Sequence, residues 1–246
     1  MKDEPFRLEM DEANRAPTIW FGRPDNGNRL LTHEIRDLGR AIRRAGESPH
    51  AKAVLLRAQG EHFCLGRQPD SGAEAPSTAL DVREKVTQPI LDLYADVRAT
   101  PVPVIAVVQG EAKGFGCALV GQCDLAISSE NAMFSMPEMD GHLPPTLAIS
   151  AVLGKVPPKR LLHMVYTRNQ VDARDALALG LLGEVVARDD LDDAVARLLD
   201  RITDRNRASL CAIKEYMSIA PHVDTAAAAR LASNILSVVL SSPKEI

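Results

Sequence analysis

The fold of this chain is decided by an apolar run, Val102-Pro103-Val104-Ile105-Ala106-Val107-Val108, and by the turn that follows it, Gly110-Glu111-Ala112-Lys113-Gly114-Phe115-Gly116. The run is typical of a buried strand, and the glycines predict a sharp turn into a short helix over 115–121. An earlier turn, Phe63-Cys64-Leu65-Gly66-Arg67-Gln68, follows a similar apolar run at 53–56. Two strand-to-turn units of this kind predict an α/β fold.

The turn at 110–116 matches neither of the common nucleotide-binding patterns. It lacks the Gly-Lys-Ser/Thr of a P-loop and the G-x-G-x-x-G spacing of a dinucleotide site. A strand-to-helix turn can aim backbone N–H groups at an anionic oxygen, although a glycine pattern alone more often marks an ordinary turn.

The remaining patterns divide the chain into a strand-and-helix part and a helical part. We expect Thr32 to cap a helix over 34–45, residues 69–78 to form a loop, and Pro89 to interrupt a helix over 80–97. Later helices are expected at 146–153, 158–166, 173–179, 191–202, 207–217 and 225–240. We therefore predict a core over 1–190 and a helical C-terminal region over 191–246, whose apolar last helix docks on its own core or on another subunit.

Composition excludes several functional classes. The net charge of -4 argues against nucleic acid as the main partner, because that partner needs a basic face. No uncharged apolar stretch approaches the ~18–20 residues that cross a bilayer, and the N-terminus has no apolar signal core, so we expect no membrane association. The four cysteines show no C-x-x-C pair and no metal spacing with histidine, which predicts reduced thiols in a cytoplasmic protein without a metal site.

A series of short motifs, in this order, resembles the landmarks of the crotonase (enoyl-CoA hydratase/isomerase) superfamily. The match spans residues 15–215 and ends with a segment, Asp172-Ala173-Arg174-Asp175-Ala176-Leu177-Ala178-Leu179-Gly180-Leu181, that resembles the family's helix followed by Gly-Leu. The earlier motifs are Phe21-Gly22-Arg23-Pro24, Phe63-Cys64-Leu65-Gly66, Val107-Val108-Gln109-Gly110, Gly114-Phe115-Gly116-Cys117, Cys123-Asp124 and Phe134-Ser135-Met136-Pro137-Glu138. The resemblance implies a crotonase-like fold of ββα spiral turns with a helical C-terminal region, and assembly into homotrimers or homohexamers.

The resemblance also implies a site. The amides of Arg67 and Phe115 would form an oxyanion hole for an acyl-CoA thioester, and Glu138 would act as general acid/base. Coenzyme A would enter as part of the substrate, with no permanently bound cofactor. The turn residues around the thioester would be Cys64, Leu65, Gly66, Arg67, Gln68, Gly114 and Phe115.

Two departures from the family pattern keep alternatives open. Hydratases of this family carry a second glutamate where this chain has Ala118, and a single carboxylate suits double-bond isomerisation better than hydration. The chain also ends without the family's Phe-Lys-Arg segment, which leaves Arg23, Arg67 and Lys113 as candidate phosphate partners, each equally readily a solvated cation.

We expect an enoyl-CoA hydratase or isomerase. The alternatives are another enolate reaction (thioester hydrolysis, C–C cleavage or decarboxylation) and a non-catalytic assembly partner.

Asp140 and His142 follow Glu138 at two-residue intervals. In an extended segment all three side chains would share one face, and either residue could then replace the missing glutamate. The alternative, which we favour, is a loop shaped by Gly141 and the prolines at 144 and 145. The family resemblance implies no metal at these residues.

Overall fold

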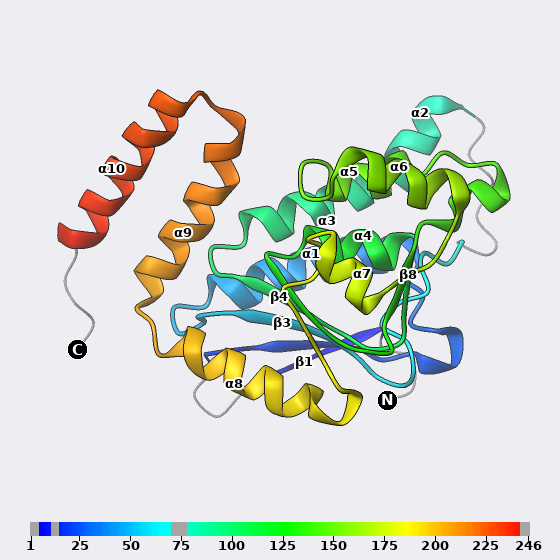
Figure 1. Cartoon of the computed structure of the whole chain (residues 1–246), viewed down its shortest axis with the longest axis horizontal. Coiled ribbons are helices and arrows are strands. Elements are labelled where there is room, and N and C mark those ends of the chain that lie inside the picture. Colours follow the sequence, from blue (N-terminus) through cyan, green and yellow to red (C-terminus); the bar gives the residue numbers. More distant parts are fainter. Residues whose placement is uncertain (1–4, 11–14, 70–77, 242–246) are drawn as a thin grey trace.

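The computed structural model of the 246-residue chain describes residues 5–10, 15–69 and 78–241. The loop expected at 69–78 and the last residues of the chain therefore lie almost entirely outside the described part. Figure 1 shows a twisted sheet with helices on both faces and a pair of helices that stands away from the body.

A six-stranded sheet forms the centre of the molecule, in the order β1-β2-β3-β4-β6-β9. Only the edge strand β1 runs antiparallel to its neighbour; the other pairs are parallel. The strands are β1 (Phe6–Glu9), β2 (Thr18–Phe21), β3 (Val54–Ala58), β4 (Val104–Val108), β6 (Leu125–Ser129) and β9 (Glu184–Val186). The buried strands read as continuous apolar runs because helices cover both faces of a parallel sheet.

A small three-stranded sheet stands beside the first, formed by β5 (Glu111–Lys113), β7 (Met133–Ser135) and β8 (Val171–Asp172) in that order. The chain enters this small sheet directly after β4, as β5, and enters it again after β6, as β7 and β8, so that strands of the two sheets alternate along the sequence. The α/β architecture predicted from the glycine turns is therefore confirmed.

Helices cover the two faces of the central sheet unequally. One face carries α1 (Thr32–Glu47), α3 (Gln88–Ala99), α4 (Phe115–Gln122) and α5 (Thr146–Val152), and the other carries α8 (Leu191–Thr203) (Figure 1). The remaining helices are α2 (Ala79–Val82), α6 (Pro158–Thr167), α7 (Ala173–Ala178), α9 (Arg207–Ile219) and α10 (Thr225–Ser241). Helix α8 packs its buried Leu191, Ala194 and Val195 against side chains of the sheet, so the body of the molecule includes this helix.

The start of α1 differs from the expectation that Thr32 caps it. Thr32 is already the first helical residue, and Leu31 occupies the N-cap position. The Glu34 carboxylate accepts a hydrogen bond from the Leu31 amide at 2.7 Å and also pairs with Arg23. An acidic side chain in the first turn can do this because the first N–H groups of a helix lack intrahelical acceptors.

The predicted interruption at Pro89 is confirmed. Residues Arg83–Thr87 form a π-helical turn between α2 and α3. Proline has no N–H to donate to the carbonyl four residues earlier, and the chain adapts just before it.

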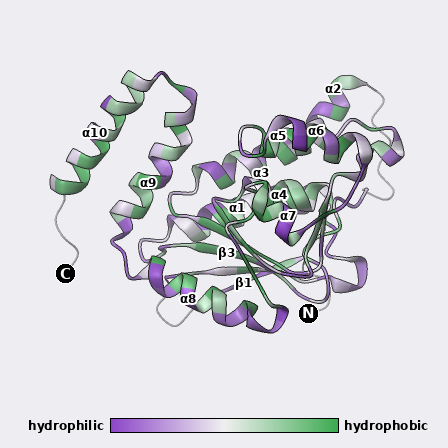
Figure 2. Cartoon of the chain, in the orientation of Figure 1, coloured by the Kyte–Doolittle hydropathy of each residue, from purple (hydrophilic) through white to green (hydrophobic). Residues whose placement is uncertain are grey.

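The last two helices form a hairpin that α9 anchors to the body. Lys214 of α9, 8% exposed, donates hydrogen bonds to the carbonyl oxygens of Val97 and Val102 and to the Asp124 carboxylate, at 2.9, 3.1 and 2.7 Å. Helix α10 packs mainly on α9 and has no buried residue. Figure 2 shows hydrophobic residues along much of α10. The large apolar side chains exposed on the hairpin include Ile213, Met217, Leu236, Val238 and Leu240.

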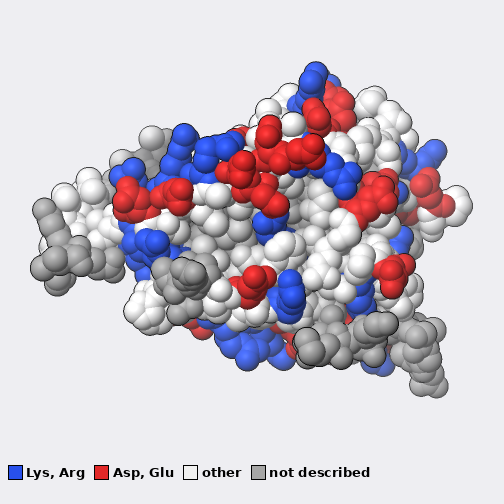
Figure 3. Space-filling view, turned by 90° about the horizontal axis from the view of Figure 1, so that it is seen from below, with Lys and Arg blue, Asp and Glu red and all other residues white. Residues whose placement is uncertain are grey.

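The charged side chains are mixed on the face that Figure 3 shows. Lys and Arg alternate there with Asp and Glu, so this face has no uniform positive surface among the described residues. None of the helices formed by the described residues has the length and apolar character that a membrane span requires.

Candidate active site

The two glycine turns lie side by side in the structure. The Cys64 amide donates a hydrogen bond to the Glu111 carbonyl oxygen at 3.2 Å, and the Lys113 amide donates to the Cys64 carbonyl oxygen at 2.9 Å. These bonds form a short parallel bridge between the first turn and β5. The predicted proximity of the two turns therefore comes directly from the backbone.

Gly66 and Gly114 have positive φ angles, 111° and 52°, which side-chain-bearing residues rarely adopt. The Gly66 carbonyl accepts from the Leu30 amide at 3.3 Å, and the Gly114 amide donates to the Ser135 carbonyl oxygen at 2.8 Å. These two hydrogen bonds hold both turns in place.

The amides of Arg67 and Phe115 donate to no acceptor among the described residues. Phe115 is the first residue of α4, where N–H groups have no intrahelical partner and the helix dipole is positive. Phe115 is 7% exposed, so its free amide lies in a largely dry environment. Two unpaired N–H groups on adjoining turns can stabilise an oxygen on which negative charge develops.

Gly116 sets how closely the two turns approach. A Cβ at this position would lie 2.1 Å from the Cys64 carbonyl oxygen and 2.9 Å from the Cys64 Cβ. Only glycine allows this contact between α4 and the first turn without moving one of them.

Glu138 lies beside the second turn, in a short 3₁₀ helix at Pro137–Gly141. Its Oε1 would be 2.8 Å from a Cβ placed on Gly114, so the carboxyl group packs directly against that glycine. Its Oε2 is buried without a hydrogen-bond partner among the described residues. Burial raises the pKa of Glu138 because the ionised form is poorly solvated there. This carboxyl group is well suited to exchange a proton with a bound ligand.

The second carboxylate of the hydratase pattern is absent from its expected position. Ala118 lies on α4 and is fully buried. The neighbouring thiol of Cys117 is also buried, and desolvation raises its pKa to about 12, which keeps it protonated and a poor nucleophile. Cys64, in the first turn, has its pKa raised to about 11 for the same reason.

Tyr94 is a site residue that sequence reasoning missed. It belongs to α3 and is 2% exposed. Burial raises the pKa of Tyr94 most, and electrostatic interaction with Cys117 and Glu138 raises this pKa further. The spacing of Tyr94 from Ile90 and Val97 predicts a buried position on a helix, but no sequence signal indicates that this residue lies within electrostatic reach of Glu138.

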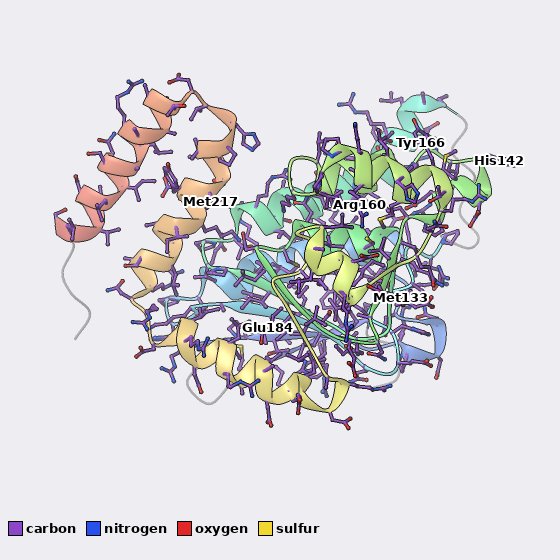
Figure 4. All side chains as sticks on the ribbon, in the orientation of Figure 1. Met133, His142, Arg160, Tyr166, Glu184 and Met217 are labelled. Atoms are coloured by element: carbon purple, nitrogen blue, oxygen red, sulfur yellow. The ribbon has the colours of Figure 1, made fainter. Side chains whose placement is uncertain are left out.

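The hypothesis that Asp140 and His142 join Glu138 on one face is wrong. The segment is a 3₁₀ helix rather than an extended strand, and Asp140 points outward to an ion pair with Arg168 at 2.8 Å. His142 is exposed, has a φ of 56°, and lies at the edge of the molecule (Figure 4). The alternative of a turn, which Gly141 and the prolines favoured, agrees with the structure.

The candidate phosphate partners have different environments. Arg23 is held internally by Glu34 and by the Arg29 carbonyl oxygen, so it is a structural residue rather than a free cation. Lys113 pairs with Glu111 at 2.7 Å. Arg67 is half-buried and has no ion pair with a described residue.

The other predicted turn residues support the first turn. Leu65 donates its amide to the Gly27 carbonyl oxygen at 2.9 Å and accepts from the Arg29 guanidinium at 2.6 Å. Gln68 accepts a hydrogen bond from the Asn26 side chain at 3.0 Å. Arg29 is a second residue that the sequence did not single out. Within the described part of the chain, no group of three or more His, Cys, Asp or Glu residues could hold a metal ion.

Comparison with known proteins supports the family resemblance. The family model described as enoyl-CoA hydratase/isomerase matches residues 12–242. The rat mitochondrial enoyl-CoA hydratase domain-containing protein 3 is 27% identical, over 84% of this chain and 68% of that protein. The (7aS)-7a-methyl-1,5-dioxo-2,3,5,6,7,7a-hexahydro-1H-indene-carboxyl-CoA hydrolase of Mycobacterium tuberculosis is 31% identical, over 74% of this chain and 72% of that protein.

Solved structures show the same fold. An enoyl-CoA hydratase of Mycobacterium smegmatis superposes with a TM-score of 0.91 at 28% identity and covers 98% of this chain and 93% of that chain. A family model that matches nearly the whole chain and a relative above 30% identity lead to one conclusion. The chain belongs to the enoyl-CoA hydratase/isomerase family, within the crotonase superfamily of acyl-CoA enzymes.

Proposed function

We propose that this protein moves the double bond of an enoyl-CoA through a stabilised thioester enolate. One observation supports this most: Glu138 is a half-buried carboxyl group whose Oε2 has no hydrogen-bond partner among the described residues, and it packs against Gly114, the residue before the free amide of Phe115. Ala118 supplies no second carboxylate. One base that removes a proton and returns it elsewhere is sufficient for isomerisation, whereas water addition needs further help with the nucleophile.

The reaction follows from these positions. The amides of Arg67 and Phe115 donate hydrogen bonds to the thioester oxygen of a 3-enoyl-CoA. The Glu138 carboxylate removes a proton from the α-carbon, and the electron pair delocalises over the thioester and the double bond as a dienolate. Protonated Glu138 then returns the proton to the γ-carbon, which gives the conjugated 2-enoyl-CoA and regenerates the carboxylate. Burial assists the removal step, because the raised pKa of Glu138 makes its carboxylate a stronger base.

The test is the absorbance of the conjugated enoyl-thioester, followed with 3-hexenoyl-CoA and with crotonyl-CoA. We expect a gain from 3-hexenoyl-CoA, reduced by about 10²–10⁴-fold in Glu138→Gln, and no loss from crotonyl-CoA. Glu130→Gln, a change at an exposed glutamate, is the matched control and should keep full activity. Loss of absorbance from crotonyl-CoA that requires Glu138 would instead identify a hydratase and refute the isomerase assignment.

A second reaction of the same enolate is favoured by one comparison. The relative at 31% identity is named a carboxyl-CoA hydrolase. This alternative predicts that 3-hexenoyl-CoA binds without conjugation and that crotonyl-CoA gains no water. A non-catalytic role would predict no turnover of any acyl-CoA and no effect of Glu138→Gln.

We also propose that the chain works as a homotrimer or homohexamer. The α9–α10 hairpin contacts the body little and exposes Leu236, Val238 and Leu240 at 57%, 65% and 76%. A subunit contact would cover these side chains. Light scattering would test this, since a monomeric mass would refute it.

The free cysteines support a cytoplasmic location, which fractionation of the source cells would test.

A further inference from the structure

Arg29 lies against the first glycine turn, and the proposed reaction does not use its side chain. It belongs to the segment that links β2 to α1 and is half-buried. Its Nη1 donates a hydrogen bond to the Leu65 carbonyl oxygen at 2.6 Å and lies 3.7 Å from a Cβ placed on Gly66. A hydrogen bond from a guanidinium is charge-assisted and is roughly twice as strong as one between neutral groups.

The Arg67 amide shares its peptide group with the Gly66 carbonyl. The Leu30 amide donates to that carbonyl oxygen at 3.3 Å, and the Gln68 amide donates to the Leu30 carbonyl oxygen at 2.8 Å. The described part of the chain has no cis peptide bond, so the C=O and N–H groups of one peptide point in opposite directions. The Arg67 N–H group therefore points away from Leu30.

Gly66 gives this donor peptide little stiffness of its own. Glycine has access to a wide range of φ and ψ angles, and the 3.3 Å hydrogen bond at the Gly66 carbonyl is a long one. Leu65, the residue before it, is held more closely: its amide donates to the Gly27 carbonyl oxygen at 2.9 Å, and its carbonyl accepts from Arg29. Without the Arg29 contact the Leu65–Gly66 peptide could rotate, and the Arg67 N–H group would change direction with it.

The backbone of Arg29 is itself fixed. Its amide donates to the Asn26 Oδ1 at 3.1 Å, and its carbonyl oxygen accepts from the Arg23 Nη2 at 3.1 Å. Arg23 in turn pairs with Glu34, near the start of α1. The guanidinium of Arg29 thus reaches the turn from a base that hydrogen bonds hold in place.

We propose that Arg29 is a positioning residue for the oxyanion hole: its guanidinium holds the Leu65–Gly66 peptide so that the Arg67 amide points at the thioester oxygen. This inference rests on the proposed function for the position of that oxygen. The contact of Arg29 is with the protein backbone, so its loss should weaken the hold on the thioester oxygen and leave the rest of coenzyme A bound as before.

The experiment measures the carbonyl stretching frequency of bound hexanoyl-CoA, isotopically labelled at its thioester carbon, by infrared difference spectroscopy. A hydrogen bond to the thioester oxygen lowers this frequency, and hexanoyl-CoA has no double bond to move. Binding of S-hexyl-CoA, a thioether that lacks the oxygen, is titrated alongside. The proteins are the wild type, Arg29→Met, Arg29→Lys and Arg40→Met. Methionine keeps an unbranched apolar stem. Arg40, 58% exposed on α1, is the matched control for loss of a guanidinium.

We expect the wild type to lower the frequency, and Arg29→Met to lose at least about half of this shift while kcat for 3-hexenoyl-CoA falls about tenfold to hundredfold at nearly unchanged KM. Arg29→Met should bind S-hexyl-CoA as the wild type does. Arg29→Lys should recover part of the shift, because its ammonium group can donate to the same carbonyl, and Arg40→Met should keep all of it.

Three results would overturn the proposal. A full shift in Arg29→Met would show that the turn needs no such support. Binding of S-hexyl-CoA that is weakened as much as that of hexanoyl-CoA would make Arg29 a coenzyme ligand instead. Failure of Arg29→Met to fold or to bind either ligand would assign the residue a purely structural role.

The two proposals fail separately. If 3-hexenoyl-CoA is not conjugated but the frequency shift depends on Arg29, the reaction is wrong and the positioning role stands. If conjugation depends on Glu138 but the shift is the same in Arg29→Met, the reaction stands and the role of Arg29 is refuted.

Discussion

Gly116→Ala should weaken the site by pushing apart the two turns that carry the free amides. The added Cβ would lie 2.1 Å from the Cys64 carbonyl oxygen, whereas ordinary contacts begin near 3.4 Å, so the turns must separate by 3.4 − 2.1 = 1.3 Å. Both contacting partners are backbone or a buried Cβ, so no flexible side chain can absorb the shift.

The free-energy change is a balance of two effects. Overpacking a tight site typically costs about 1–3 kcal/mol, while alanine favours a helix over glycine by up to about 1 kcal/mol. With an overpacking cost in the middle of that range, about 2 kcal/mol, the net destabilisation is about 1–2 kcal/mol, which corresponds to a fall in Tm of roughly 2–8 °C for a chain of this size. A displacement of this size also withdraws one oxyanion donor, which typically costs about 10²–10³-fold in kcat.

The assay combines thermal unfolding with isomerisation of 3-hexenoyl-CoA. Gly141→Ala is the matched control, because a Cβ at Gly141 meets no atom within 4 Å. It should change neither Tm nor kcat appreciably. The reasoning is refuted if Gly116→Ala behaves like Gly141→Ala in both measurements.

Two further predictions concern charge. Burial raises the pKa of Glu138, and its carboxyl group must be ionised to remove a proton. On acidification, kcat/KM for 3-hexenoyl-CoA should therefore begin to fall at a pH above ~4.3, the pKa of an ordinary glutamate. A pH–rate profile whose acid limb lies at that ordinary value would contradict this. Lys214→Met should lower the free energy of unfolding by about 2–3 kcal/mol, because it leaves Asp124, which is one-third exposed, and two carbonyl oxygens without their partner. Urea denaturation measures this, with the exposed Lys159→Met as control; equal midpoints for the two variants would show that the Lys214 contacts contribute nothing.

Much of the fold could be predicted because the signals are local. The helix predicted over 34–45 corresponds to α1, and its apolar stripe of Ile35, Leu38 and Ile42 is fully buried. Pro89 predicted the break before α3. The predicted later helices each correspond to an observed helix, with ends that differ by a few residues.

The parts that escaped prediction depend on contacts far along the chain. Strands β8 and β9 have two and three residues, too few for a periodic pattern, and exist because β7 and β6 offer them free edges. Glu34 rather than Thr32 caps α1, because Arg23 holds its carboxylate in place.

The candidate site shows the same limit. The two turns and Glu138 were recognised from short motifs, since their backbone geometry requires glycine or proline. The hypothesis that Asp140 and His142 join Glu138 required an extended segment, whereas the turn that we favoured from Gly141 and the prolines agrees with the 3₁₀ helix and leaves both residues exposed. Tyr94 approaches Glu138 only because α3 packs beside α4, which no local pattern reveals.

The two free N–H groups belong to the main chain, so they are retained when the side chains around them are replaced. No replacement of the Arg67 or Phe115 side chain by another residue with an N–H removes a donor, so a saturation library should tolerate many residues at both positions. Gly66, Gly114 and Gly116 should tolerate few, because the first two have positive φ and the third has no room. Selection can therefore alter the walls around the acyl chain, one side chain at a time, while the groups that hold the thioester oxygen persist unchanged.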